Sequence, residues 1–203
     1  MHFKASSHAP ARPGALRRAL GWRERLSRVA RWLVCVVGTV LAVHAAETEL
    51  SSFEVVHNEE GVLLSYAVNI ELSRSVDDAL SKAVPLFFVA EAEVFRDRWY
   101  WRDARVAQAT RSWRIVYQPL TSTYRVTFAG RSQNYNSREE ALTSISRAAG
   151  WKVAEPGQIE EGSKYYIEFS YRLDTSLLPR PMQIGIGGQP DWALQVQRRQ
   201  RLN

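Results

Sequence analysis

The sequence predicts a mainly β protein, an antiparallel β-sandwich-like domain with two short helices; an α+β arrangement is the alternative. Three observations lead to this prediction. Apolar residues alternate with polar ones in several segments, turn residues separate those segments, and only two segments carry helix-capping signals. The sequence has no repeat of solenoid or propeller spacing, so we expect one compact domain over residues 46–196.

The clearest strand pattern lies between residues 62 and 72, where every second residue is Val, Leu, Tyr or Ile. Residues 57–61 join it to a strand at 53–56, and Gly61 supplies the unusual backbone angles that a hairpin turn needs. Similar alternation predicts strands at 113–117, 124–128 and 165–173, with a turn at 118–123. Strands of this kind bury one face against a core.

Two segments are predicted to be helical. Residues 75–82 begin with Ser75 as the expected cap and have acidic residues in the first turn. Residues 137–148 begin with a capping box, in which Ser137 precedes Glu140, and Gly150 is expected to end the helix. Proline and glycine are dense from 179 to 190, which indicates a loop or an edge.

The positive charge of the chain is concentrated in its first 31 residues. They hold eight of the 27 Lys and Arg residues against a single acid, Glu24, whereas 19 basic and 20 acidic residues follow from residue 46 onward. The remainder is close to neutral, so we expect no nucleic-acid partner, because phosphate binding needs positive charge on the folded domain.

Residues 1–45 have the order of a secretory signal, with a basic stretch, an apolar stretch from Trp32 to Val43, and small residues before a cut after Ala45. Twelve apolar residues are short for a helix that spans a membrane, so we expect this segment to be cleaved. An uncleaved inner-membrane anchor is the alternative. The expected location is the periplasm. Cleavage would remove Cys35, the sole cysteine. The basic residues 197–203 are expected to form a frayed tail.

The segment from Phe95 to Arg114 is unusually rich in arginine and tryptophan. If it is one strand, alternation places Phe95, Asp97, Trp99, Trp101 and Asp103 on one face and Arg96, Arg98, Tyr100 and Arg102 on the other. The predicted binding residues are Arg96, Arg98, Trp99, Trp101, Arg102 and Arg114. Arginines bind carboxylates and phosphates, and aromatic rings bind sugars or peptides. The alternative is a strand with tryptophans in the core and arginines solvated or paired.

Catalytic and metal chemistry have few candidates. Glu91, Glu93, Asp97 and Asp103 are the carboxylates that an enzyme acting on polysaccharide would use, but residues two apart on one strand point the same way and do not flank a bond. His57 is the one histidine after residue 45, in a predicted hairpin turn. We therefore predict no metal, no cofactor and no catalytic histidine.

Three motifs occur in order behind the leader: residues 98–103 (RWYWRD), 117–126 (YQPLT with YRV), and 173–183 (LDTSLLPRPMQ). With them the chain resembles the exported proteobacterial family catalogued as domain of unknown function 4390. The resemblance covers the whole chain after the leader. It implies an envelope protein of a Gram-negative bacterium, and it implies no assigned activity.

Three functional hypotheses remain open. The first is a non-enzymatic periplasmic module that binds an envelope protein or an anionic or glycan ligand through the Arg/Trp segment. The second is a carboxylate-dependent enzyme acting on envelope polysaccharide. The third is a structural partner in a membrane complex, held by an uncleaved leader.

Overall fold

The computed structural model describes residues 48–98, 102–160, 162–186 and 188–202. The predicted signal peptide or anchor at residues 1–45 lies outside the described residues, as do Trp99 and Trp101. Within the described ranges, no helix has the length and apolar character to cross a bilayer.

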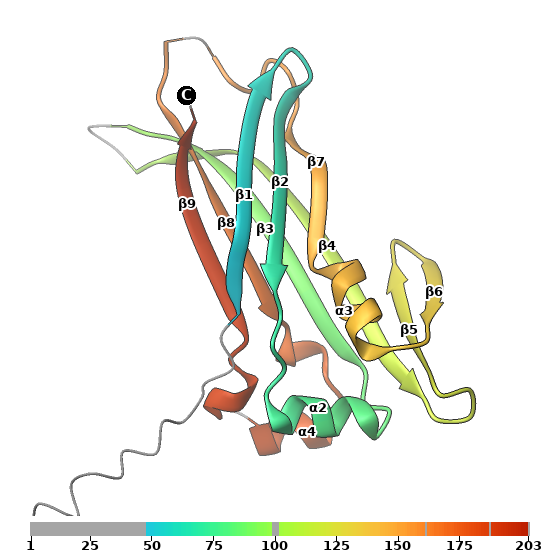
Figure 1. Ribbon diagram of the computed structural model, residues 1–203. Helices are drawn as coiled ribbons and strands as arrows, with labels where there is room; N and C mark the ends of the chain where they lie inside the picture. The colour runs from blue at the N-terminus through green and yellow to red at the C-terminus, as the bar shows by residue number, and fades with distance from the viewer. Residues whose placement is uncertain (1–47, 99–101, 161, 187, 203) are drawn as a thin grey trace, which may run out of the picture. The chain divides into compact units, whose positions relative to one another are not determined.

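The described chain is mainly β, in two antiparallel sheets that form a sandwich-like arrangement (Figure 1). One sheet has three strands in the order β1-β2-β7, and the other has six in the order β6-β5-β4-β3-β8-β9. The strands are β1 (Glu49–Asn58), β2 (Gly61–Asn69), β3 (Leu86–Arg96), β4 (Ala104–Gln118), β5 (Thr123–Phe128), β6 (Arg131–Tyr135), β7 (Arg147–Ala154), β8 (Tyr165–Leu173) and β9 (Gln195–Leu202). The helices are α2 (Arg74–Ser81), α3 (Arg138–Ile145) and α4 (Arg180–Ile186), with 3₁₀ turns η1 (Thr175–Leu177) and η2 (Pro190–Trp192).

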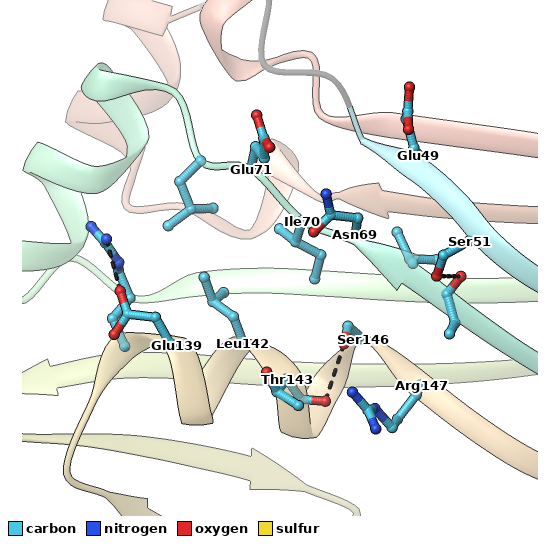
Figure 2. Close-up of a pocket in the computed structure, with 14 residues that line it drawn as sticks. Glu49, Ser51, Asn69, Ile70, Glu71, Glu139, Leu142, Thr143, Ser146 and Arg147 are labelled. Atoms are coloured by element: carbon cyan, nitrogen blue, oxygen red, sulfur yellow. Dashed lines mark hydrogen bonds and ion pairs between the residues drawn. The ribbon is translucent and has the colours of Figure 1, made fainter.

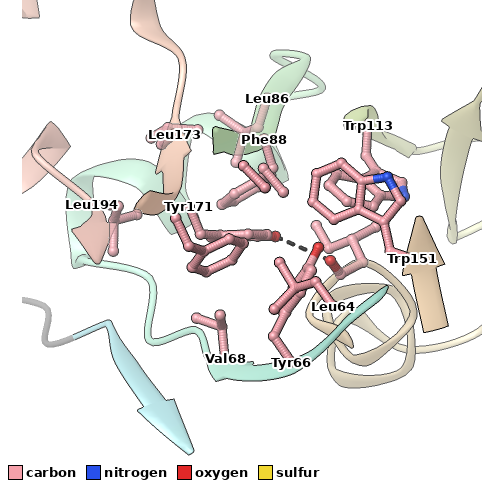
Figure 3. Close-up of a cluster of buried hydrophobic side chains, with 14 of the residues drawn as sticks. Leu64, Tyr66, Val68, Leu86, Phe88, Trp113, Trp151, Tyr171, Leu173 and Leu194 are labelled. Atoms are coloured by element: carbon pink, nitrogen blue, oxygen red, sulfur yellow. Dashed lines mark hydrogen bonds between the residues drawn. The ribbon is translucent and has the colours of Figure 1, made fainter. Parts of the chain in front are cut away.

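The core lies between the two sheets, and aromatic residues fill its centre (Figure 3). Tyr66 of β2 packs on Phe169 of β8 with ring centroids 4.6 Å apart, and Phe88 of β3 stacks on Tyr171 of β8 at 6.0 Å. The Tyr171 hydroxyl donates to the carbonyl of Ile145 at the end of α3, at 3.2 Å. The buried alternate residues of β2 and β8 are those that the sequence pattern predicts.

The predicted hairpins are confirmed. β1 and β2 pair from Asn58 opposite Gly61 onward, and Gly61 has φ +109°. A Cβ at this position would lie 2.1 Å from the carbonyl oxygen of Ala154, so both the backbone angle and the close approach require glycine. The predicted turn between β4 and β5 lies at residues 119–122.

Gly150 does not end a helix, and strand β7 was missed by the sequence analysis. Helix α3 begins as predicted, with the Ser137 hydroxyl accepting from the Glu140 N–H at 3.1 Å, but its last residue is Ile145. Gly150, with φ +57°, lies inside β7, where the register with β2 shifts, and its N–H donates to Ser65 Oγ at 3.0 Å. A glycine in αL conformation serves a β-bulge as well as a helix end.

The predicted helix at 75–82 is present, but its cap is Ser73 and not Ser75. The Ser73 hydroxyl accepts from the Val76 N–H at 3.2 Å. Ser75 instead donates to Asp191 Oδ2 at 2.8 Å, which ties α2 to η2. Several serines near a helix start make the cap ambiguous in sequence, and tertiary contacts decide it.

The C-terminal region is more ordered than the sequence predicts. The loop expected at 179–190 contains helix α4 and part of η2, so the described part of the chain has three helices rather than two. The expected frayed tail at 197–203 is wrong: residues 195–202 form β9, paired with β8 from Tyr165 to Arg172. Three of the eight residues of β9 are arginine, so the weak alternation that includes Val196 and Leu202 does not indicate a strand in the sequence.

Candidate functional site

The Arg/Trp segment is not one long strand. β3 ends at Arg96 and β4 begins at Ala104, so residues 97–103 connect the two strands of a hairpin. The expected division of residues 95–103 into two strand faces is therefore wrong. The alternation of residue types does not indicate that the chain reverses here, because the connection contains no Gly or Pro, the residues that usually mark a turn.

Asp103 holds the base of the β3–β4 connection. One carboxylate oxygen accepts from the Arg98 backbone N–H at 3.1 Å, and the other accepts from the Tyr166 hydroxyl at 2.7 Å. The guanidinium of Arg199 lies 3.7 Å from the second oxygen. The Tyr166 hydrogen bond, followed by the Arg98 N–H, lowers the pKa of Asp103. Burial, reinforced by the bond to Asp103, raises the pKa of Tyr166 to about 12.

An aromatic and arginine stack lies beside this anchor on the outer face of the larger sheet. Phe95 and Tyr166 are opposite each other on β3 and β8, and their rings stack at 5.3 Å. The Arg199 guanidinium from β9 lies over the Tyr166 ring at 3.7 Å from its centroid. Arg199 is not among the residues predicted from the sequence, because residues 197–203 were expected to form a tail.

The structure places the predicted binding residues that it describes in three different settings. Arg96 is already engaged: its Nε donates to the Tyr165 hydroxyl at 3.1 Å, it pairs with Glu160, and the Tyr165 bond raises the pKa of Arg96. The Arg98 and Arg102 side chains are exposed in the connection. Trp99 and Trp101 fall outside the described residues.

Arg114 lies apart from the other predicted residues. It is ten residues along β4 from Ala104, which corresponds to about 34 Å of extended strand. It is paired opposite Phe87 of β3, at the other end of the sheet. The structure therefore brings Arg98 and Arg102 together in one connection but does not bring Arg114 to them.

Two of the candidate catalytic carboxylates, Glu91 and Glu93, are held by ion pairs. Glu91 accepts from Gln108 at 2.5 Å and from Arg172 at 3.2 Å, and Glu93 pairs with Arg105. They border a hollow of about 300 Å³ that includes Glu168 and Arg199. Asp97 is exposed beyond the end of β3, and its backbone N–H donates to the Lys164 carbonyl at 2.8 Å. The geometry favours a structural role for the two glutamates.

The family comparison agrees with the extent of the folded domain. The sequence model of one family, described as a domain of unknown function (DUF4390), matches residues 45–202. The chain belongs to the DUF4390 family. No curated protein and no solved structure matches the chain. The family description states no activity, so we infer the function of this DUF4390 protein from its own surface.

A hollow larger than the one beside Glu91 and Glu93 lies away from the predicted residues of this DUF4390 protein (Figure 2). It has a volume of about 720 Å³ and lies between the start of β1, the end of β2 and helix α3. Its lining mixes Glu49, Glu71 and Glu139 with Arg138 and Arg147. Arg138 is paired with Asp77 at 2.5 Å and with Glu139 at 2.9 Å. No motif in the sequence indicates this hollow, because its walls come from three distant segments.

Metal chemistry has no candidate site in the described part of the chain. No group of three His, Cys, Asp or Glu residues is close enough there to hold an ion. His57 is exposed in strand β1, near its end, rather than in the turn itself.

Proposed function

We propose that this DUF4390 protein is an exported, periplasmic envelope protein that acts as a non-enzymatic binding module for an anionic partner. The β3–β4 connection is the surface that we assign to binding. The observation that carries the proposal is the arrangement at its base: Asp103 fixes the connection to β8 through Tyr166, and Arg98 and Arg102 extend from it exposed.

A connection fixed at its base suits recognition. Ordering a loop on binding costs free energy, and holding the two described ends of the connection together, at Arg98 and Asp103, avoids part of that cost. Across the described residues, Arg98 and Arg102 have no ion pair, so their guanidinium groups are available to a carboxylate or phosphate partner. Trp99 and Trp101 belong to the same connection in sequence and add aromatic character to it.

The export part of the proposal is supported by the order of basic, apolar and small residues in the first 45 residues. Cell fractionation with intact-mass analysis tests it. A periplasmic species that starts near Ala46 supports export with cleavage. A full-length species held in the membrane supports the anchor, and a cytoplasmic species contradicts export.

The binding part is tested by crosslinking in whole cells. The variant carries both Arg98→Ala and Arg102→Ala, and the matched control carries Arg131→Ala and Arg180→Ala, which remove the same charge from exposed positions elsewhere. We expect the first pair to lose a crosslinked neighbour that the control retains, with both proteins folded. If the neighbours are the same in both variants and in the unmodified protein, the assigned surface is wrong.

A further inference from the structure

Three large aliphatic side chains of the described chain are strongly exposed to solvent. Leu120, in the turn between β4 and β5, is fully exposed, Ile184 of α4 is 88% exposed, and Leu177 of η1 is 51% exposed. Among the residues that the structure describes, Val56 and Phe128 are the other exposed large apolar side chains, at 42% and 37%. Exposed apolar residues that gather at one place mark a surface that contacts a protein or a membrane.

The pairing of the strands places these three side chains at the same end of the domain. β3 begins at Leu86, opposite Ile115 of β4, and β8 ends at Leu173, opposite Phe88. The β4–β5 hairpin continues beyond this point to its turn at residues 119–122, and the chain after β8 continues into η1 and α4 (Figure 1). The hairpin and the η1–α4 segment therefore project from one end of the six-stranded sheet.

Helix α4 is apolar on two sides. Met182 and Ile186, four residues apart, pack against the core, whereas Ile184, between them, faces outward. Gln183 holds the helix against η1, because its Nε2 donates to the carbonyl of Ser176 at 2.6 Å. The fold uses one apolar side of the helix and leaves the other side to a further apolar surface.

The two projecting segments carry no negative charge. The β4–β5 turn contains no charged residue, and residues 175–190 contain one base, Arg180, and no acid. At the same end, the exposed Asp78 of α2 is accompanied by two exposed bases, Arg74 and Lys82. Apolar side chains with bases beside them are typical of segments that lie on a membrane with anionic headgroups.

The described chain also begins at this end. Glu49, the first residue of β1, pairs with Asn69 at the end of β2, which continues toward α2. Six residues lead from Val43, the last residue of the predicted apolar stretch, to Glu49, and they span about 20 Å at most. If the leader is retained as an anchor, this length keeps the start of β1 close to the bilayer. If the leader is cleaved, the exposed side chains themselves supply the contact.

We propose that the β4–β5 turn and the η1–α4 segment rest on the surface of a lipid bilayer, with Leu120, Leu177 and Ile184 inserted among the acyl chains. A fluid bilayer accepts apolar side chains from separate projections. A protein partner would instead need a surface that is complementary in shape to both projections.

This contact would orient the surface that we assign to binding. The β3–β4 connection lies at the other end of β3, whose 11 residues correspond to about 35 Å of extended strand. Arg98 and Arg102 would then face away from the bilayer. The inference rests on the export part of the proposed function, which brings the domain to an envelope membrane, and is independent of the partner proposed for the connection.

The test reads the surroundings of single side chains, so it serves for protein recovered from cells with or without its first 45 residues. Leu120→Cys, Ile184→Cys and Val56→Cys are each made in a Cys35→Ser chain and labelled with an environment-sensitive fluorophore. Val56 is the matched control, because it is an exposed apolar residue near the end of β1, next to the β1–β2 turn at the opposite end of the domain. The probe is a vesicle of phosphatidylethanolamine and phosphatidylglycerol whose brominated acyl chains quench a fluorophore that lies among them.

We expect the labels at positions 120 and 184 to shift to shorter wavelength and to be quenched when vesicles are added, and the label at position 56 to be unchanged. No change at positions 120 and 184, or an equal change at all three positions, overturns the proposal. A shift at position 184 that rises with protein concentration in the absence of vesicles shows that a second copy covers this end, and it overturns the proposal too.

A carboxylate in place of one apolar side chain tests the insertion directly. In the chain labelled at position 120, Ile184→Glu should lower the quenching by about half or more, because a charged group is costly in hydrocarbon. Val56→Glu adds the same charge elsewhere and should leave the quenching unchanged. Equal losses in the two variants would mean that only the net charge matters, and the proposal would be wrong. If Ile184→Glu does not fold, as judged by its melting temperature, Leu177→Glu takes its place.

The outcome is separable from that of the proposed function. Quenching is measured on purified protein with added vesicles, so it does not depend on where the protein is found in fractionated cells. It does not depend on the crosslinked neighbour either, because Arg98 and Arg102 are unchanged in all of these variants. A failure of the vesicle test therefore overturns the bilayer contact alone.

Discussion

Tyr166 and Asp103 join the outer face of the six-stranded sheet to the β3–β4 connection through a 2.7 Å hydrogen bond. The same carboxylate accepts from the Arg98 backbone N–H, so one side chain bridges β8 and both arms of the hairpin. Tyr166 is itself held by the Phe95 ring on β3 and by Arg199 on β9. The position of the exposed Arg98 and Arg102 therefore depends on residues from three strands outside the connection proper.

In the Asp103→Asn variant, the free energy of unfolding should fall less between neutral pH and acid than it does in the unmodified protein. Because the folded-state pKa of Asp103 is lowered, its stabilising effect is complete above the unfolded pKa of about 3.9 and is lost as the pH falls through the lower folded value. Urea unfolding at neutral pH and at about pH 3 measures the difference. Asp97→Asn is the control, because no hydrogen bond or ion pair of its side chain occurs in the described chain. Identical acid dependence in the Asp103→Asn variant and the unmodified protein would contradict the role of Asp103.

Gly61→Ala should destabilise the fold far more than Gly130→Ala. Both glycines have positive φ, +109° and +78°, but an added Cβ meets the Ala154 carbonyl at 2.1 Å at Gly61 and meets nothing within 4 Å at Gly130. We expect a loss of about 3 kcal/mol or more at Gly61, where strain and overlap combine. The loss at Gly130 should be about 1 kcal/mol from the backbone angle alone. Denaturant unfolding compares the two, and similar losses would show that the contact with β7 is unimportant.

The sequence predicts the segments whose side chains alternate strictly, and the structure confirms them in β2, β5 and β8. The prediction fails where one local sequence pattern is compatible with two different structures. Gly150 is an acceptable helix end as well as a bulge residue, and the fold decides for the bulge. Residues 95–103 alternate like a strand although the chain reverses there.

Ser73→Ala should cost about 1 kcal/mol of unfolding free energy, because the Ser73 hydroxyl caps α2 through the Val76 N–H. Ser75→Ala tests a different contact, the 2.8 Å hydrogen bond to Asp191 that ties α2 to η2. The effect of Ser75→Ala on the free energy of unfolding should be coupled to that of Asp191→Ala in a double-mutant cycle. The effect of Ser73→Ala should instead add independently to that of Asp191→Ala. Urea unfolding of the unmodified protein, the three single variants and the two double variants that contain Asp191→Ala gives both values. Coupling of Ser73 rather than Ser75 to Asp191 would contradict these assignments.

Truncation after Leu194 should destabilise the protein severely, because β9 pairs with β8 along Tyr165–Arg172 and carries Arg199 over Tyr166. Its loss exposes the backbone edge of β8 and uncovers part of the core beneath Val196 and Leu202. We expect a lower melting temperature and aggregation on heating, followed by calorimetry and light scattering. The matched control keeps the strand and removes two exposed charges, Arg198→Ala with Arg201→Ala. This control should unfold almost as the unmodified protein does, since isolated surface charges contribute little. Unchanged stability of the truncated chain would mean that residues 195–203 behave as a frayed tail, and the pairing of β8 with β9 would then be wrong.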